Sequence, residues 1–240
     1  MTSTTVPSGN NIADTSAIVI DTTAPTVSSF TLSDTSLIAG ETATVTLVFS
    51  EAVAGFDSDD DITAPSGTLA TMTSSDNITW TGTFTPTTST EDSSNVLTLA
   101  TSYTDTTGNT GPSATTANYA VDTTAPTVTS FSSSTTNGSY NAGDTVNITA
   151  TTSESIQSGN TLTVTLNTGD TVVLTAASAG TTLTGIYTVG VGDTSSDLTV
   201  SSFAIGTVAD SAGNAMTSTT VPSGNNIADT SAIVIDTTAP

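Results

Sequence analysis

The chain of 240 residues contains 22 Asp and Glu residues but no Lys, Arg, His or Cys, so its net charge at pH 7 is −22. The missing cations exclude binding to a nucleic-acid backbone and disfavour anionic membrane surfaces, and the missing Cys excludes disulfides and thiol chemistry. The longest apolar runs hold about five residues, far below the ~20 that a membrane-spanning helix needs, but 35% hydrophobic residues are enough to build a core.

The sequence repeats itself. Its first 25 residues, MTSTTVPSGNNIADTSAIVIDTTAP, recur as residues 216–240. The shorter stretch DTTAP stands at Asp21–Pro25, Asp122–Pro126 and Asp236–Pro240, and it marks off two units of domain size. We therefore expect four segments: the C-terminal strand of a preceding repeat (1–20), two domains (21–121 and 122–235), and a linker to the next repeat (236–240).

In chain order, apolar and polar residues alternate over Glu41–Ser50 and again over Asn77–Phe84, where Trp80 stands in register with core positions. The second unit shows the same alternation over 146–150 and 162–166. A period of two, rich in β-branched Thr and Val, is typical of half-buried antiparallel strands. About seven strands in about 100 residues predict an immunoglobulin-like fold with almost no helix. The expected class is all-β, with tandem immunoglobulin-like β-sandwiches in an extended array.

Acidic residues are expected to gather at one end of the first sandwich. In a seven-stranded antiparallel sandwich, alternate loops lie at the same pole, and the entrance pole then receives eight of the twelve carboxylates of this unit: Asp21, Glu51, Asp57, Asp59, Asp60, Asp61, Asp76 and Asp105. Two carboxylates ~4 Å apart repel by about 4 kcal/mol at an effective dielectric constant of about 20, so such a cluster favours a divalent cation. Hard oxygen ligands select Ca²⁺, and zinc is nearly excluded without His and Cys.

The loop motifs DTTGN (105–109) and DSAGN (210–214) recur at matching places in the two units. Each pattern is typical of a tight turn, in which Gly108 or Gly213 adopts a left-handed conformation and the Asp caps backbone N–H groups. Two interpretations stay open here, a turn alone or a turn that also binds calcium. In the run DSDDD (57–61), a solvated stretch of charge is an equally open interpretation.

Several segments resemble a known family. DTTAPTVSSF, AGETATVTLVFSEAVAGF, ITWTGTFTPTTSTED and DTTGN, spread over 21–121, are similar to the bacterial immunoglobulin-like extender domains of giant repetitive adhesins. In the second unit, GSYNAGDTVNITATTSES, VGDTSSDLTV, VADSAGNAM and AIVIDTTAP resemble a sister repeat of bacterial surface proteins. The resemblance implies calcium-stiffened rods at the bacterial cell surface or outside the cell. The resemblance also implies that Asp61 is a calcium ligand, because Asp61 aligns with an aspartate that stands before the next strand in the family.

The resulting prediction is a non-catalytic spacer whose partners are calcium ions and neighbouring repeats of the same chain. The predicted calcium ligands are Asp21, Glu51, Asp61, Asp105 and Asn109 in the first unit, and Asp122, Glu154, Asp210 and Asn214 in the second.

The sequence bears on three functions other than a spacer. An enzyme is disfavoured because, without His, Lys, Cys or Arg, only carboxylate-pair chemistry remains. A self-associating filament, sheath or surface layer would add lateral contacts between chains. A carbohydrate-binding module would need exposed aromatic side chains, for which Tyr119 and Tyr140 are the candidates.

Overall fold

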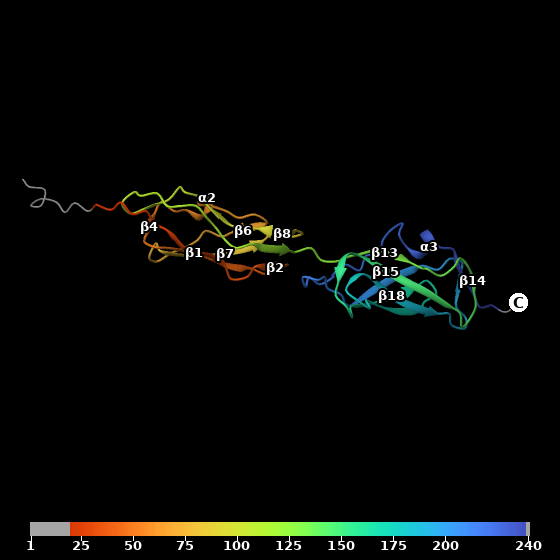
Figure 1. Ribbon diagram of the computed structural model, residues 1–240. Coiled ribbons are helices and arrows are strands. Elements are labelled where there is room, and N and C mark those ends of the chain that lie inside the picture. The colour runs from red at the N-terminus through yellow and green to blue at the C-terminus, as the bar shows by residue number, and fades with distance from the viewer. Residues whose placement is uncertain (1–19, 239–240) are drawn as a thin grey trace, which may run out of the picture. The chain divides into compact units, whose positions relative to one another are not determined.

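The computed structural model describes residues 20–238, whose regular secondary structure is almost entirely β-strand, in two compact units (Figure 1). The first unit comprises the chain up to Thr35, Thr42–Thr85 and Asn95–Asn118, and the second comprises Ser36–Glu41, Pro86–Ser94 and the chain from Tyr119 onward. The all-β prediction is confirmed. The domain limits 21–121 and 122–235 stay a prediction, and the strand predicted within 1–20 lies, apart from Ile20, outside the described residues.

The first unit contains two main sheets, with strand orders β1-β3-β7-β6 and β11-β9-β5, and a small pair β10-β4. These are the sheets of an immunoglobulin-like β-sandwich. The bounds are β1 (Val27–Leu32), β3 (Ala43–Phe49), β4 (Val53–Ala54), β5 (Ile62–Thr63), β6 (Gly67–Leu69), β7 (Thr79–Pro86), β9 (Thr98–Leu99), β10 (Thr104–Asp105) and β11 (Ala114–Thr115), with one short helix, α2 (Ser58–Asp61).

The predicted alternation forms the core of the first unit. Along β3, Val45, Leu47 and Phe49 are buried while the side chains between them are at least partly exposed. Each buried residue removes apolar surface from water, which is worth about 1.5–3 kcal/mol for a large aliphatic side chain. Trp80 is half-buried and packs edge-on against Phe56, with ring centroids 4.8 Å apart.

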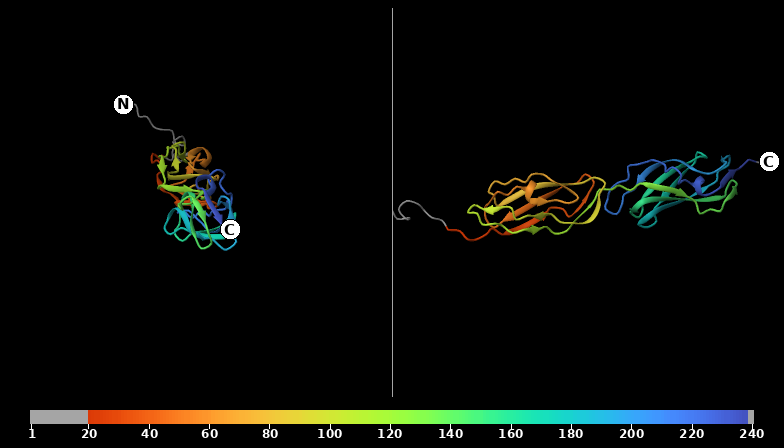
Figure 2. Two further views of the ribbon diagram at one scale, coloured as in Figure 1. Left: turned by 90° about the vertical axis from the view of Figure 1, so that its right-hand side faces the viewer. Right: turned by 90° about the horizontal axis from the view of Figure 1, so that it is seen from above.

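The second unit has one large sheet, in the order β13-β15-β18-β17-β16-β20, and two small ones, β14-β21-β19 and β2-β12-β8. Its strands run along the length of the unit, and loops gather at both ends (Figure 2). The bounds are β2 (Ser36–Ile38), β8 (Glu91–Asn95), β12 (Tyr119–Asp122), β13 (Val128–Ser132), β14 (Gly138–Tyr140), β15 (Thr145–Ile156), β16 (Thr161–Leu166), β17 (Thr171–Thr175), β18 (Gly180–Thr188), β19 (Thr194–Ser195), β20 (Val200–Thr207) and β21 (Ile233–Asp236), with helix α3 (Ile227–Thr230).

A long segment between β20 and β21 closes this second sandwich. Its helix α3 has an Asn226 cap, and a reciprocal bond from the backbone of Asn226 to the Asp229 carboxylate forms a capping box. Ile227 is completely buried, and Ile233 and Ile235 of β21 join the same core. The segment therefore belongs to the core although little of it is regular structure.

The two units share details of register. A β-bulge interrupts β1 between Val27 and Ser29, and the equivalent bulge interrupts β13 between Val128 and Ser130. In both units a glycine stands opposite a buried residue of the longest central strand pair: Gly82 faces Val45, and Gly185 faces Ile148.

These two glycines allow a neighbouring chain segment to pass closely. A Cβ at Gly82 would lie 2.9 Å from the carbonyl oxygen of Ala70 and 2.8 Å from Cγ of Met72. A Cβ at Gly185 would lie 2.6 Å from the carbonyl oxygen of Val173. Because a backbone carbonyl cannot turn aside as a flexible side chain can, any larger residue must push the segment away.

We expect Gly82→Ala and Gly185→Ala each to destabilise its own unit by about 1–3 kcal/mol, the usual cost of overpacking. The single Trp lies in the first unit, so tryptophan fluorescence follows that unit during urea unfolding, while circular dichroism follows both. Gly82→Ala should lower the fluorescence midpoint and Gly185→Ala should not. Thr83→Val, at an exposed neighbouring position, is the control and should change the free energy of unfolding by less than about 0.5 kcal/mol.

Candidate metal centres

The entrance of the first unit is tied to the end of β3. The Asp21 carboxylate accepts a hydrogen bond from the Thr23 N–H at 2.9 Å, which forms a local Asx turn. Three residues after Thr23, Thr26 and Ser50 are bonded twice, from Thr26 N–H to the Ser50 hydroxyl and from Ser50 N–H to the Thr26 carbonyl, both at 2.9 Å. The chain therefore enters the sandwich beside Glu51, the residue that follows Ser50.

The loop 105–109 brings a third acid to the same place. Oδ1 of Asp105 accepts hydrogen bonds from the N–H groups of Thr107, Gly108 and Asn109 at 2.7–2.9 Å, and Gly108 has a φ of +101°. The predicted turn is confirmed. Burial raises the pKa of Asp105, but hydrogen bonds from Asn109 and Thr107 outweigh this effect and hold the pKa well below its ordinary value. Asp105 is thus a fixed, ionised carboxylate although its side chain is buried.

These three segments bring Asp21, Glu51 and Asp105 together, with one carboxylate oxygen of each within 4.8 Å of the others. Further oxygens surround the neighbouring amide of Asn109. Its Nδ2 donates to Oδ2 of Asp105 at 2.7 Å and to the carbonyl oxygens of Asp21 and Thr23 at 3.2 and 3.3 Å. The site is therefore built from oxygen atoms of the entrance linker, the end of a strand and a loop.

The second unit repeats this construction. Thr127 N–H donates to the Ser153 hydroxyl at 3.0 Å, and Ser153 N–H donates to the Thr127 carbonyl at 2.8 Å. Oδ1 of Asp210 accepts from the N–H groups of Gly213 at 2.6 Å and Asn214 at 2.9 Å, and Gly213 has a φ of +118°. One carboxylate oxygen each of Asp122, Glu154 and Asp210 again lies within 4.8 Å of the other two.

Glu154 carries the clearest sign of a missing partner. Its Oε1 is buried and accepts no hydrogen bond from the described residues 20–238. Burial, and then the negative charges of Asp210, Asp122 and Glu91, raise the pKa of Glu154 to about 7. A buried carboxylate oxygen without a donor costs free energy, and a bound cation would remove that cost.

Both sites fit calcium on the chemistry of their donors. Two unit charges 4.8 Å apart repel by about 3.5 kcal/mol at an effective dielectric constant of about 20. The chain has no basic side chain that could offset this repulsion. Carboxylate and carbonyl oxygens on loops make a flexible, all-oxygen cage, which suits Ca²⁺ better than Mg²⁺ or a transition metal.

The amides of Asn109 and Asn214 both turn their NH₂ groups towards the carboxylates. Nδ2 of Asn214 donates to Oδ2 of Asp210 at 2.8 Å and to Oδ1 of Asp122 at 3.2 Å, while its Oδ1 accepts from the N–H of Ala39 at 2.9 Å. Asn109 likewise points its NH₂ group at the acids. Both amides hold the carboxylates in place. Calcium ligation through their oxygens stays a prediction and would require each amide to turn over.

Asp61 lies apart from both groups of three acids. It is buried, and its carboxylate accepts hydrogen bonds from the Ser102 hydroxyl and, at 2.8 Å, from the Asp57 N–H. Asp57 caps helix α2 by accepting from the Asp59 N–H. The run 57–61 therefore forms a capped helical turn. Calcium binding by Asp61 stays a prediction, and Asp61 is not one of the three acids that lie together in the first unit.

Sequence reasoning missed Ser50 and Ser153, which fix the entrance of each unit beside its glutamate. A signal was present, because a Ser-Glu pair stands directly after β3 in the first unit, at 50–51, and near the end of β15 in the second, at 153–154.

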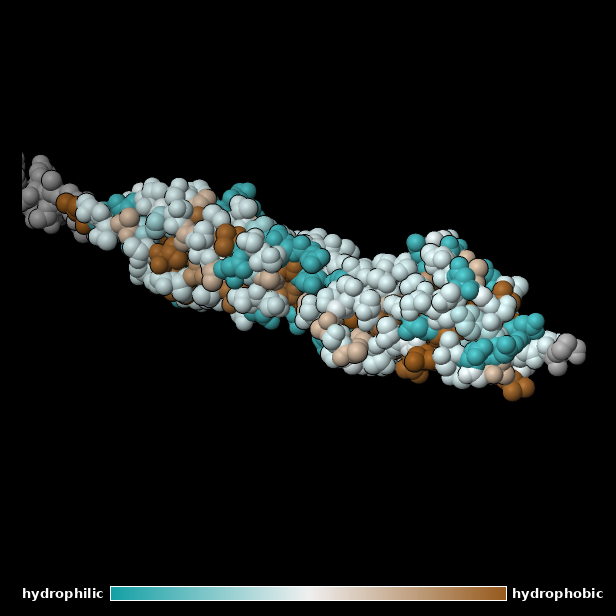
Figure 3. Space-filling model, turned by 45° about the vertical axis from the view of Figure 1, so that its right-hand side comes forward, coloured by the Kyte–Doolittle hydropathy of each residue, from teal (hydrophilic) through white to brown (hydrophobic). Residues whose placement is uncertain are grey.

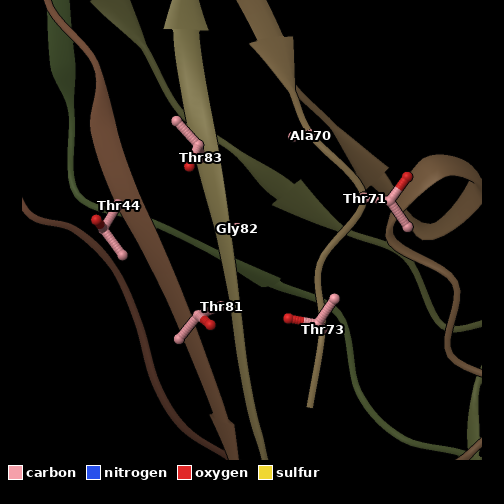
Figure 4. Close-up of a pocket in the computed structure, with 7 residues that line it drawn as sticks. All are labelled: Thr44, Ala70, Thr71, Thr73, Thr81, Gly82 and Thr83. Carbon is pink, nitrogen blue, oxygen red and sulfur yellow. The ribbon is translucent and has the colours of Figure 1, made fainter.

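The residues considered for carbohydrate binding do not form a stacking platform. Tyr119 is completely buried, so the expectation that it could be exposed is wrong: it shares the inner face of β12 with Val121. Tyr140 is partly buried and donates its hydroxyl proton to the Thr136 carbonyl. A shallow groove of about 300 Å³ beside β7 is lined by small and hydroxyl residues without an aromatic ring (Figure 4): Thr44, Ala70, Thr71, Thr73, Thr81, Gly82 and Thr83.

The pKa of Glu154 makes a prediction about pH. Between its ordinary value of 4.5 and about 7, the folded second unit binds more protons at this site than the unfolded chain does. Its stability should therefore fall as pH rises through that window in calcium-free buffer. Urea unfolding at pH 5 and pH 7.5, followed by circular dichroism, measures the change. Glu154→Gln should abolish this part of the pH dependence, whereas Glu51→Gln should leave it intact.

A comparison with known protein families finds a match over residues 21–121. Residues 21–121 match the family model of a bacterial Ig-like domain, and no curated protein matches the chain. Bacterial Ig-like domains are non-catalytic structural domains, usually of extracellular or surface proteins. Within residues 20–238, no helix has both the length and the apolar character needed to cross a membrane. Over residues 21–121, this chain is therefore similar to a bacterial Ig-like domain.

Proposed function

We propose that this chain is a non-catalytic spacer from a large secreted or surface-anchored bacterial adhesin or fibre, in which Ig-like domains follow one another and calcium stiffens the links between them. The observation that supports this most directly is the unpartnered, buried Oε1 of Glu154 beside Asp122 and Asp210. The same construction around Asp21, Glu51 and Asp105 supports a second ion.

In each unit the proposed ion would connect three parts of the chain that are otherwise separate. In the first unit, Asp21 comes from the DTTAP linker, Glu51 from the end of β3, and Asp105 from a loop. An ion held by all three fixes the linker to its domain, and the proline of DTTAP already restricts φ to near −65°. Length and stiffness are then the function, and the remaining carboxylates keep the rod soluble.

The surface supports a spacer better than a lattice-forming protein. On the face that Figure 3 shows, most of the surface is pale, the colour of residues of intermediate hydropathy such as Thr and Ser. Among the described residues the exposed large hydrophobic side chains are Ile20, Val96, Val173, Ile186 and Val191. Apolar area of this kind is small for a lateral interface, and a net charge of −22 makes parallel rods repel each other.

Calcium should stabilise each unit separately. With a dissociation constant of ~10⁻⁴ M, as in many extracellular modules, 10 mM calcium adds about 2.7 kcal/mol per site. Chelation should then lower the melting temperature of each unit by roughly 10–20 °C. Differential scanning calorimetry with and without calcium, at matched ionic strength, measures this change.

The matched variants Glu51→Gln and Glu154→Gln keep the side-chain volume and remove one carboxylate. Glu51→Gln should remove most of the calcium-dependent rise in the melting temperature of the first unit, which Trp80 fluorescence follows. It should leave the calcium-dependent rise in the second unit unchanged. Glu154→Gln should do the reverse. If calcium raises the melting temperature of both variants as much as that of the unaltered chain, these acids do not bind the ion.

Calcium should also lengthen the molecule in solution, because repelling carboxylates at an empty site let the linker bend. Small-angle X-ray scattering of the 240-residue chain should give a larger maximum dimension in calcium than in chelator. Asp122→Asn should reduce the difference. Sedimentation in calcium should give the mass of one chain; a calcium-dependent rise in mass would instead favour a self-associating filament, sheath or surface layer.

A further inference from the structure

The second unit contains a segment whose sequence occurs twice in the chain. Residues 216–240 are identical to residues 1–25. In the structure, the second copy supplies four side chains to the core of its unit, each at most 4% exposed: Met216, Ile227, Ile233 and Ile235. The residues with the same places in the first copy are Met1, Ile12, Ile18 and Ile20.

The segment also bonds to several strands of the second unit through its backbone and its amides. β21 pairs in parallel with β14, from Gly138 opposite Ile233 to Tyr140 opposite Ile235, and pairs antiparallel with β19. Before β21, the side chain of Asn226 both accepts from the N–H of Val200 at 3.0 Å and donates to its carbonyl at 2.8 Å.

A further bond fixes the start of α3. The carbonyl of Asn225 accepts from the N–H of Phe131 in β13 at 2.9 Å. Met216–Asp236 thus occupies a defined slot, which contacts β13, β14, β19 and β20. In the first copy, the residues equivalent to Asn225 and Asn226 are Asn10 and Asn11.

We propose that the slot of the second unit accepts residues 1–20 of another copy of this chain, so that two chains join by exchange of this segment. Every side chain of residues 216–235 that contacts the slot has an identical counterpart in residues 1–20. The incoming segment can therefore make the same core contacts, strand pairs and amide bonds. The proposal does not depend on calcium or on the proposed spacer function.

Concentration decides which copy fills the slot. The chain's own segment is tethered, and a short flexible tether gives an effective concentration of about 1 mM. At a chain concentration of about 10 µM, an equally good segment from another chain would fill only about 1% of the slots. The intact chain should therefore stay monomeric, and exchange should appear when its own segment is disabled or transiently released.

Four full-length proteins test the proposal: the unaltered chain, a variant with Ile227→Asp and Ile233→Asp, a matched variant with Ile12→Asp and Ile18→Asp, and a variant with all four changes. An aspartate in a fully buried position disables a segment because its carboxylate loses its hydration there and the chain has no basic side chain to pair with it. All four proteins are compared in the same calcium-containing buffer, by sedimentation and by amide hydrogen exchange of β14 and β19.

At about 100 µM, the variant changed at 227 and 233 should form dimers or longer chains, with at least twice the mass of one chain and with β14 and β19 protected. The variant changed at 12 and 18 should be a protected monomer. The fourfold variant should be an unprotected monomer. The proposal is overturned if β14 and β19 of the variant changed at 227 and 233 are as unprotected as in the fourfold variant, or if that variant is protected as a monomer. It is also overturned if the fourfold variant associates as strongly as the variant changed at 227 and 233.

A peptide with the sequence of residues 1–25 provides a second measurement. Added in excess to the chain changed at 227 and 233, it should restore protection of β14 and β19 and return the mass to that of one chain with one peptide. The same peptide with Ile12→Asp and Ile18→Asp is the control and should restore neither. Equal binding of both peptides, or no binding of the unaltered one, would contradict the proposal.

Discussion

Repulsion between carboxylates, in a chain that has no positive side chain of its own, is the constraint on which the rest of this structure depends. No acid can form a salt bridge with a basic residue, so each buried carboxylate needs N–H or O–H donors or an ion from solution. Asp61 and Asp105 are satisfied in the first way, by a hydroxyl and by backbone amides. Glu154 is not, since its Oε1 has no donor among residues 20–238 and its pKa rises to about 7.

The same local hydrogen bonds position the acids of the two proposed metal sites, although the middle strands of the two units differ in sequence. A serine, directly after β3 in the first unit and near the end of β15 in the second, is bonded twice to the threonine that follows the DTTAP proline, and the next residue is the glutamate. The Asx turn of DTTAP forms at Asp21, Asp122 and Asp236 alike. The position of the acids therefore depends on backbone pairing at the mouth of the sandwich and very little on the side chains that fill its core.

Sequence reasoning was sufficient for features that follow from periodicity or from loop order. Alternation predicted the strands, and the rule that alternate loops share a pole predicted that Asp21, Glu51 and Asp105 would meet. It could not place Asp61, because one helical turn decides whether that side chain faces solvent or the hydroxyl of Ser102, which lies in a loop far away in the sequence. Tyr119 was considered as an exposed aromatic residue, but its side chain is buried. The buried Val121, two residues later in β12, lies on the same face of the strand and indicated this. The packing of 36–41 and 86–94 with the second unit depends on contacts far apart in sequence, which no local pattern reveals.

The parallel pairing of β14 with β21 has a mechanical consequence. β14 lies near the start of segment 122–235 and β21 at its end, and their neighbouring backbones run in the same direction. A pull on the two ends draws such strands past each other, so the hydrogen bonds between Gly138–Tyr140 and Ile233–Ile235 are loaded in shear and must fail together. In an antiparallel pair loaded at one end, the bonds would instead open one by one. β12 and β2 are also paired in parallel, from Ala120 opposite Ser36 to Asp122 opposite Ile38. Resistance to tension is set by the rate of forced unfolding and not by equilibrium stability. A fold of modest thermodynamic stability can thus hold under load for longer than its melting temperature would suggest.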